Sequence, residues 1–488
     1  MRPRTPVILL LLLLGLFGAR GARAAGTQDL FGAPGSLAPL SALALDSHGA
    51  VVANPAALAL LGEGVWLGLS LAGGDLDLSY LGRPQGSDIS AQVFDAWPSP
   101  AGKPMPTAML APRGGSNPDF SVWMLDAGFV RRLGPLVLGF STVLPLGALQ
   151  NQQPFFNDQR QQYFDNSLHF ELLGDRLETS QMAVALAASP LPWLHLGAGL
   201  TLQSASTAST GVFVQDALDR DGALYLPRVR VKNSFAAQAS AAFVPGGAGG
   251  DLAIFLRWQG PAASTVEARS SQLIYGLEPD DQGGSAQDFV YGWLPHRLGL
   301  GASRSFHPSP GLALEAQLDA SWWQWSAYRN RSGDRPLDTW QNTMPLSGAL
   351  LLRPRGLPNL GLSALFAPSP VPPQVGRENH LDSNRLGLAL ALGLPFRLAG
   401  TAFELRLAGQ AHWYQDRSVR KDLGAAHPVS DEFPDSDSAD GASLADSAGL
   451  QTNNPGYPGY ALGGVLWHLG LSLVMGPSQP STKGPPAP

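Results

Sequence analysis

The sequence contains no cysteine among its 488 residues. This absence excludes disulfide bonds, thiolate metal sites and cysteine nucleophiles. Charged residues are scarce at 14%, whereas about a quarter is usual for a soluble domain. The net charge of −6 is small and gives no indication of nucleic-acid binding. Beyond the N-terminal region, no stretch of about 18 uninterrupted apolar residues occurs, so transmembrane helices are not expected.

The N-terminus combines the features of a secretory signal peptide. Arg2 and Arg4 precede a short apolar run at 7–17, and a small-x-small pattern ends at Ala24. This order predicts that residues 1–24 are a signal peptide that is cleaved on export. The alternative is a retained membrane anchor, for which the apolar run is short.

Apolar and polar residues alternate with a period of two in many segments of about ten residues. Between Leu312 and Trp322 the even positions are apolar, while the odd positions include Glu315, Gln317 and Asp319. Because successive side chains of a strand point to opposite faces, such a segment has one apolar and one polar face. Repetition of this pattern behind an export signal predicts an all-β fold, a transmembrane antiparallel β-barrel with lipid outside and a polar lumen.

The same pattern defines fourteen expected strands, an even number as closure of a single-chain barrel requires. They place the barrel at residues 62–475, with short turns on the periplasmic side and long connections outside the cell. The alternative is a large soluble β-sandwich or β-helix, which would carry more surface charge. The expected strands are 65–82, 119–133, 135–148, 177–189, 193–206, 225–243, 251–271, 286–306, 311–329, 336–353, 358–370, 382–397, 401–419 and 459–475.

Charged and aromatic residues fall at regular places in this pattern. Charges lie on the face opposite the leucines, because a Lys or Arg turned toward lipid near the midplane costs about 2–4 kcal/mol. Most of them are expected to pair across neighbouring strands in the lumen. These lumen charges are Arg230, Lys232, Arg257, Arg297, Glu315, Asp319, Arg385, Glu404 and Arg406. Aromatic residues near segment ends are expected at the membrane interfaces, namely Tyr291, Trp293, Trp322, Trp323, Trp325, Tyr328, Trp413 and Tyr414.

Residues 25–61 precede the first expected strand and lack the period of two. The segment is rich in Gly, Ala, Ser and Leu, and so apolar a segment would not remain solvated. Because a fourteen-stranded barrel has space in its lumen, the segment is expected to pack inside as a plug. After the last strand, the tail 476–488 is rich in Pro, Ser and Gly and is expected to be disordered.

Three stretches carry a resemblance to a known family. The first is 46–58, with the core Asn54-Pro55-Ala56-Ala57-Leu58, and the second is 293–325, a hairpin that ends in Trp325-Ser326. The third is Ser369-Pro370-Val371-Pro372 with Gln374, followed by Leu381-Asp382-Ser383-Asn384-Arg385. In this order and spacing they resemble the FadL/TodX-type outer-membrane transporters of long-chain fatty acids and hydrocarbons.

The resemblance implies a barrel that is blocked by an N-terminal hatch, which here includes Asn54, Pro55 and Ala56. In that family a hydrophobic ligand leaves sideways through an opening at an inward kink of the third strand. In this chain the alternation of the third strand breaks at Pro145 and Gly147. Because proline removes a ladder donor and glycine weakens a strand, the break predicts either a kink or an ordinary strand end.

The connection after the third strand, 149–176, is rich in large apolar side chains. These side chains would form a capture surface for a hydrophobic ligand, or a small core of the loop itself. Its candidate ligand contacts are Phe155, Phe156, Phe164 and Phe170. Arg385, next to the third family-like stretch, is the candidate contact for a polar end of the ligand. Relatives often carry an acidic residue just ahead of the Ser-Pro-Val-Pro stretch, where this chain has Ala367 and Pro368.

These features predict a passive transporter for hydrophobic small molecules in the outer membrane of a Gram-negative cell. No Gly-x-Ser-x-Gly elbow and no His/Asp cluster with metal-ligand spacing is found, so an enzyme, a metal or a cofactor is not expected. The main alternative is a general diffusion porin for small hydrophilic solutes, with an open lumen. Expected partners are the ligand, outer-membrane lipid, lipopolysaccharide and the barrel-assembly machinery, for a monomer that binds no nucleic acid.

Overall fold

The fold is a β-barrel with a segment of chain inside it, as a computed structural model shows. The structure describes residues 28–84, 120–146, 169–170, 179–205, 223–232, 234–247, 250–274, 284–330, 333–431, 450, 452, 454 and 456–476. The predicted signal peptide and nearly all of the predicted tail lie outside these residues.

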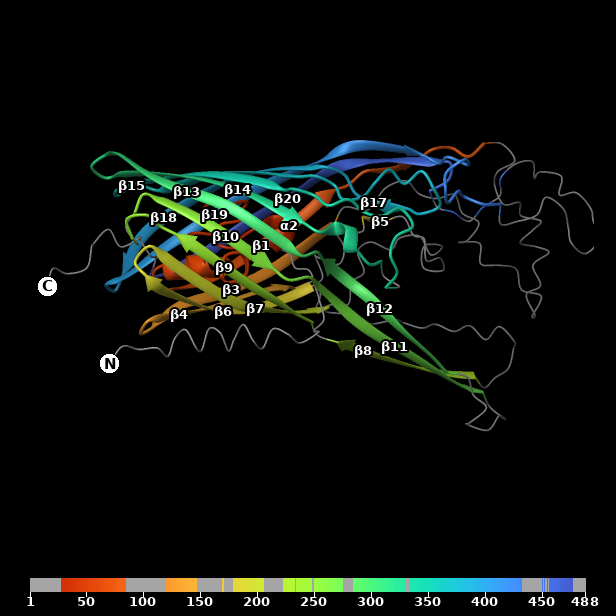
Figure 1. The fold of residues 1–488 in the computed structure, drawn as a ribbon, viewed down its shortest axis with the longest axis horizontal. Coiled ribbons are helices and arrows are strands. Elements are labelled where there is room, and N and C mark those ends of the chain that lie inside the picture. The colour runs from red at the N-terminus through yellow and green to blue at the C-terminus, as the bar shows by residue number, and fades with distance from the viewer. Residues whose placement is uncertain are drawn as a thin grey trace, which may run out of the picture.

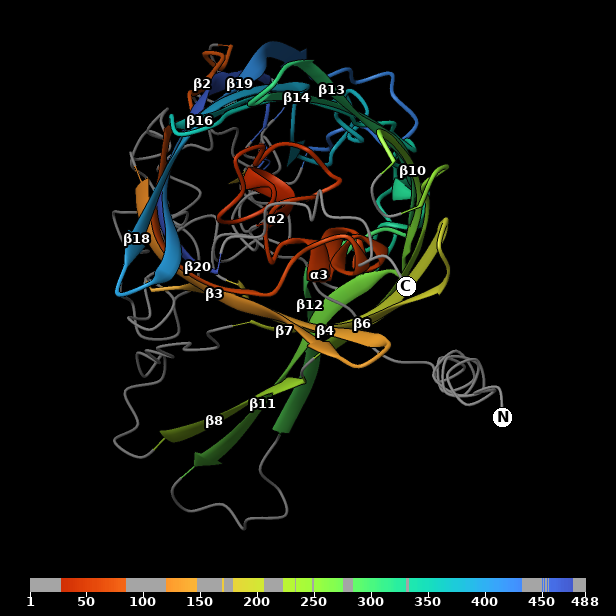
Figure 2. The same cartoon turned by 90° about the vertical axis from the view of Figure 1, so that its left-hand side faces the viewer.

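Fourteen strands of the described chain form a closed antiparallel barrel (Figures 1 and 2). Closure occurs because β1 (Gly64–Asp75) pairs on one side with β3 (Phe120–Leu133) and on the other with β20 (Gly459–Met475). A short strand, β2 (Leu78–Tyr80), continues alongside β20. The other barrel strands are β4 (Leu136–Pro145), β6 (Thr179–Leu191), β7 (Leu194–Ala205), β9 (Ser234–Phe243), β10 (Leu252–Gln259), β13 (Arg297–Ser309), β14 (Leu312–Trp323), β15 (Leu346–Pro354), β16 (Asn359–Ala367), β18 (Arg385–Leu398) and β19 (Thr401–Arg420).

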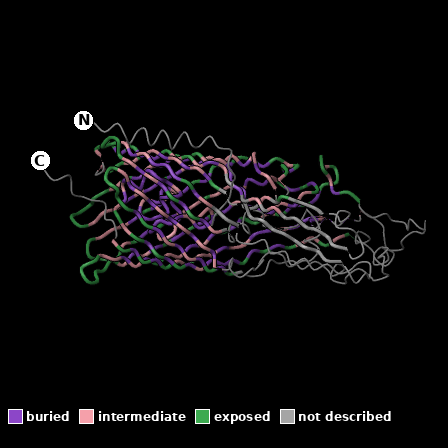
Figure 3. The backbone as a smooth tube through the Cα atoms, turned by 90° about the horizontal axis from the view of Figure 1, so that it is seen from below, coloured by how far each residue is buried: buried purple, intermediate pink, exposed green. Residues whose placement is uncertain are grey.

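The predicted alternation of faces is confirmed along the barrel wall. In β18, Leu388 and Leu390 are 43% and 64% exposed, whereas Ala389 and Ala391 between and beyond them are buried. Figure 3 shows buried and more exposed residues interleaved along the barrel strands. Because the exposed positions are the leucines, the outer surface of the barrel is apolar, as a lipid environment requires.

Three predicted strands were wrong in extent, because each divides into two. Residues 225–243, 251–271 and 286–306 supply β9, β10 and β13 to the barrel, but their other halves leave it. These halves are β8 (Ala223–Lys232), β11 (Ala262–Ile274) and β12 (Gly284–Leu294), which form a separate three-stranded sheet (Figure 1). Strands of a separate sheet can show the same alternation of apolar and polar residues as barrel strands. The alternation therefore does not indicate where the barrel ends.

The division has a local cause at two of the three places. Gly260-Pro261 separates β10 from β11, and Pro295 follows the last residue of β12. Proline cannot donate to a ladder and glycine weakens a strand, so pairing changes partners there. Arg230 and Lys232 lie on β8, outside the barrel sheet, which corrects their prediction as lumen charges. The strand predicted at 336–353 begins only at Leu346, directly after Pro345.

Residues 28–61, called the hatch from here on, lie inside the barrel ring (Figure 2). They contain α2 (Gln28–Phe31), α3 (Ala50–Ala53) and the 3₁₀ helix η2 (Pro55–Ala59). Much of the hatch is buried. Its core consists of apolar side chains, the most buried of which are Leu43, Ala50, Val51, Ala56, Ala57 and Leu58. Within the described residues, no helix has the length and apolar character needed to cross a membrane.

Candidate functional site

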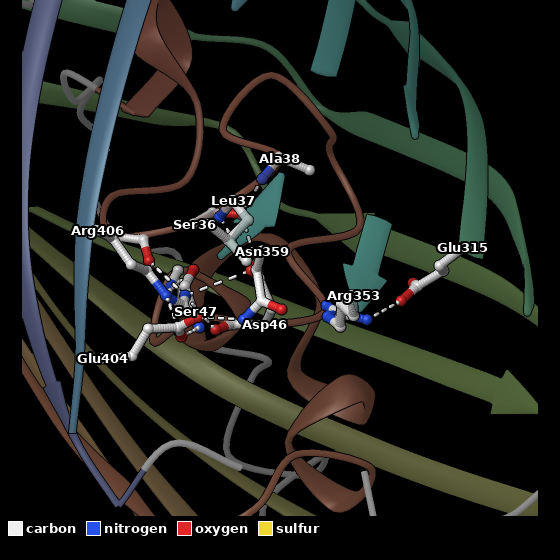
Figure 4. Close-up of polar contacts among 12 residues, drawn as sticks. Ser36, Leu37, Ala38, Asp46, Ser47, Glu315, Arg353, Asn359, Glu404 and Arg406 are labelled. Carbon is white, nitrogen blue, oxygen red and sulfur yellow. Dashed lines mark hydrogen bonds and ion pairs between the residues drawn. The ribbon is translucent and has the colours of Figure 1, made fainter. Parts of the chain in front are cut away.

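The hatch is attached to the wall by a buried group of charges (Figure 4). Arg406 of β19 donates to Asp46 Oδ2 at 3.3 Å, to the Asp46 carbonyl at 2.9 Å and to the Gly35 carbonyl at 2.7 Å. Its Nε also donates to Glu404 at 2.8 Å. The Asp46 carboxylate in turn accepts the Leu37 N–H at 2.9 Å, so one wall arginine fixes a turn of the hatch. Breaking a buried pair of this kind leaves an uncompensated charge, which costs about 3–5 kcal/mol.

A second attachment joins the hatch to two neighbouring strands. The ring of His48 lies 2.9 Å from Ser141 of β4 through Nδ1 and 3.2 Å from Asp126 of β3 through Nε2. All three residues are buried, with His48 fully so. Although serine, histidine and aspartate meet here, both ring nitrogens of His48 contact side chains of the wall. The arrangement therefore attaches the hatch to β3 and β4.

Arg385, the predicted ligand contact, also binds the hatch. It is 6% exposed, and its guanidinium donates to the backbone carbonyls of Leu30 at 3.0 Å and Asp29 at 3.1 Å. Arg297 of β13 pairs with the Asp29 carboxylate from another side of the barrel. Two wall arginines thus hold α2, and Arg385 additionally borders a cavity of the lumen.

This cavity, called the lumen cavity from here on, has a volume of about 140 Å³. It lies between the hatch and the wall, with Gln28 and Val52 on the hatch side and Arg257, Trp323 and Leu365 on the wall side. Arg257 donates to the Ala42 carbonyl at 2.8 Å and pairs with Asp319. The lining is therefore partly cationic and partly apolar.

The sequence placed Arg257 and Arg297 among the lumen charges but did not single them out as site residues. A usable signal was present, because Asp29 and Asp46 are the two acidic residues of an otherwise uncharged stretch, 25–61, and each needs a cation inside the barrel. The structure supplies Arg297 for Asp29 and Arg406 for Asp46.

An aromatic cluster lies next to the cavity, because Trp323 lines the cavity and also packs against the cluster. Trp293, Trp325, Tyr328 and Trp340 are buried together, and the rings of Tyr328 and Trp340 stack at 3.6 Å between centroids. Their prediction as interfacial residues was wrong for Trp293, Trp325 and Tyr328, because the chain folds over them. Val371 joins the same cluster. The second and third family-like stretches therefore meet in space.

The connection between β16 and β18 is hydrogen-bonded to the residue that follows β19. Lys421, which is 8% exposed, donates to the carbonyls of Gln374, Gly376 and Glu378 at 2.7–2.8 Å. Burial lowers the pKa of the Lys421 ammonium to about 7, although the carboxylates of Asp338 and Glu378 oppose this shift. Lys421 follows a strand of 20 residues, which is far longer than the 9–11 residues or so that span a bilayer.

Pairing between β4 and β6 ends close to the position of the predicted kink. The β3–β4 ladder continues to Pro145, but the β4–β6 ladder stops at Val143 opposite Gln181. The described part of β4 thus separates from β6 two residues before its own end, and Gly147 lies outside the described residues.

The predicted capture loop is mostly outside the described residues as well, including Phe155, Phe156 and Phe164. The backbone of Phe170 is described, in the two-residue strand β5 (His169–Phe170), which pairs in parallel with β17 (His380–Leu381). Among the described residues, no group of three or more His, Asp or Glu could hold a metal ion.

Comparison with known proteins gives a likeness of fold. No protein-family model matches the chain, and no curated protein sequence matches it. Among solved structures, the chain is similar to a FadL homologue of Pseudomonas aeruginosa, with a TM-score of 0.53 and 14% identity over 94% of this chain and 100% of that chain.

Two further solved structures have TM-scores of 0.42. The monoaromatic hydrocarbon channel CymD is 10% identical over 93% of this chain and 97% of that chain. The toluene transporter TodX of P. putida is 9% identical over 91% of this chain and 98% of that chain. At such identities the likeness to the FadL homologue concerns the fold alone: a closed barrel of fourteen strands with an N-terminal segment ahead of it.

Proposed function

We propose that this protein is a passive outer-membrane channel through which hydrophobic small molecules enter the cell. The observation that carries the proposal is the buried hatch inside an apolar-surfaced barrel. The hatch lies inside the barrel ring (Figure 2), its core side chains are buried, and it is attached to the wall through Arg406, His48 and Arg385. A porin for hydrophilic solutes needs a continuous aqueous lumen, which such a hatch opposes. The shared fold of the FadL homologue and the three family-like stretches support the same assignment.

The ligand is proposed to leave sideways, between β4 and β6. The support is the early end of their ladder at Val143 and Gln181, next to a proline that has no N–H to donate. Gln181 also lines the lumen cavity, so the cavity reaches the wall where pairing stops. Capture of the ligand is proposed at the connection 149–176, where Phe155, Phe156 and Phe164 occur.

Uptake by whole cells tests the proposal, because a lipopolysaccharide-covered outer membrane resists hydrophobic solutes. A Gram-negative host without a channel of this kind would express the protein, and entry of radiolabelled toluene and of hexadecane would be measured against the empty host. We expect faster entry of at least one of them. In parallel, liposomes containing the protein would be tested for swelling in sugar solutions. Swelling together with unchanged toluene and hexadecane entry would replace the proposal by the porin alternative.

A further inference from the structure

Side chains that line the lumen cavity carry buried hydrogen-bond donors that have no partner among the described residues. They are Nε of Arg257, Nε and Nη2 of Arg297, Nε2 of Gln28 and Nε1 of Trp323. A buried donor without a partner costs about 1–3 kcal/mol, so native structures retain few of them. Five such atoms belong to side chains that line one cavity, and an acceptor bound in the cavity would supply the partner that they lack.

The charge of the lining is also unbalanced. Arg257 pairs with Asp319 and Arg297 pairs with Asp29, whereas the hydrogen bonds of Arg385 go to two backbone carbonyls. Within the described part of the chain, three guanidinium groups therefore face two carboxylates, which leaves one positive charge at the cavity. Gln181 is the exception among the unpartnered groups, since its Oε1 is an acceptor, but rotating the amide by half a turn would present its NH₂ group.

The volume and the remaining lining limit the size of the ligand. The cavity of about 140 Å³ is close to the engineered apolar cavity of about 150 Å³ that binds benzene. Apolar surface comes from Leu40, Val52, Leu365 and the ring of Trp323, on which Arg297 stacks at 3.8 Å from the centroid. The space therefore fits a single ring or a short chain that carries one charged group.

We propose that the lumen cavity is a binding subsite for a small organic anion, a carboxylate on one aromatic ring or on a short chain. The carboxylate would accept hydrogen bonds from Arg257, Arg297, Gln28 and Trp323, and the ring would lie against Leu365 and Val52. The inference rests on the proposed function, since it names a substrate class for the same channel. It differs from that function in requiring a charge on the ligand.

Calorimetric titration of the detergent-solubilised protein tests the subsite, with benzoate as the probe. Benzyl alcohol serves as the neutral ligand of similar size, sodium phosphate as the inorganic anion and decanoate as the long-chain acid. We expect saturable binding of benzoate at least tenfold tighter than that of benzyl alcohol. Equal binding of the two, tighter binding of phosphate, binding of decanoate alone, or no saturable binding at all would overturn the inference. The last result would mean that the donors are met by water.

Two variants connect the binding to the cavity. Trp323→Phe removes one unpartnered donor and keeps a ring, so we expect benzoate affinity to fall about tenfold. Leu365→Trp fills the cavity without changing its charge and should abolish benzoate binding. Trp413→Phe is the matched control, because Trp413 is 41% exposed on the outer face of β19. Benzoate binding that is unchanged in both cavity variants contradicts the inference, whereas toluene uptake by cells tests the proposed function separately.

Discussion

At the scale of single residues, the barrel wall has glycine at positions where the hatch backbone comes closest. A Cβ atom on Gly197 of β7 would lie 2.3 Å from the carbonyl carbon of Pro55, and one on Gly361 of β16 would lie 1.8 Å from the carbonyl oxygen of Leu37. Contacts this short between a Cβ atom and the backbone are essentially never seen in real structures. The backbone cannot move aside, whereas the far end of a flexible side chain can. These glycines therefore make room for the hatch backbone, including the Asn-Pro-Ala turn that the sequence marked.

Gly197→Ala should accordingly loosen the hatch. Overpacking of this kind costs about 1–3 kcal/mol, and the strain falls on the contact between Pro55 and the wall. The expected result is earlier thermal unfolding and faster proteolytic cleavage within the hatch. Gly470→Ala on β20 is the matched control, because its nearest neighbour would lie at 3.6 Å, an ordinary contact. Equal behaviour of the two variants would mean that the hatch does not sit against β7.

Lys421 gives a prediction about pH. Burial lowers its pKa to about 7 in the folded protein, from the usual 10.5. Between these values the unfolded chain binds one proton more than the folded protein, so this group makes stability rise with pH across that window. Below pH 7 or so both states are protonated, and the contribution no longer changes.

The measurement is the thermal midpoint in detergent at pH 6, 7, 8 and 9 for the wild type and Lys421→Met. The wild type should gain stability relative to the variant between pH 7 and 9 and run parallel to it below pH 7. Arg131→Met, at an exposed side chain of the wall, should keep the wild-type profile. Parallel curves for wild type and Lys421→Met over the whole range would show that the lysine keeps its ordinary pKa.

At the scale of strands, the exposed leucines define where the barrel meets lipid. Leu390→Arg, at a position that is 64% exposed in the middle of β18, should lower the unfolding free energy in lipid vesicles by about 2–4 kcal/mol. Leu423→Arg is the control, since Leu423 is 54% exposed but lies in the connection after β19. If the two substitutions cost the same, β18 does not face lipid at Leu390.

The strands also show what the sequence could predict. A period of two indicates which face of a strand a residue occupies. Fourteen strands, their apolar outer face and the lumen charges of β14, β18 and β19 could therefore be predicted from the sequence. The pattern does not indicate which strands are neighbours, so the separate sheet of β8, β11 and β12 could not be predicted. The site was even harder to predict, because Arg385 binds Leu30, which lies 355 positions away in the sequence. Such pairings follow from closure of the barrel around the hatch.

At the scale of the whole molecule, the hatch and the barrel form one packed unit, so the proposed transport would require the hatch to move. The N–H of Ala56 donates to Ser240 Oγ of β9 at 2.7 Å, so the two residues are in contact and are the pair chosen for an engineered disulfide bond. The native chain has no cysteine. In the double variant Ala56→Cys and Ser240→Cys, oxidation therefore has one target, and a reducing agent reverses it.

Oxidation of this double variant should stop the uptake of toluene or hexadecane by cells, and reduction should restore it to the rate of the untreated variant. The single variants Ala56→Cys and Ser240→Cys, treated with the same oxidant, should transport at their initial rates. Uptake that continues after the bond has formed, as checked by electrophoresis without reductant, would mean that the ligand passes beside a stationary hatch. In that case the route would have to follow the lumen cavity from Arg297 to Gln181, both of which line it, with η2 remaining fixed to β9.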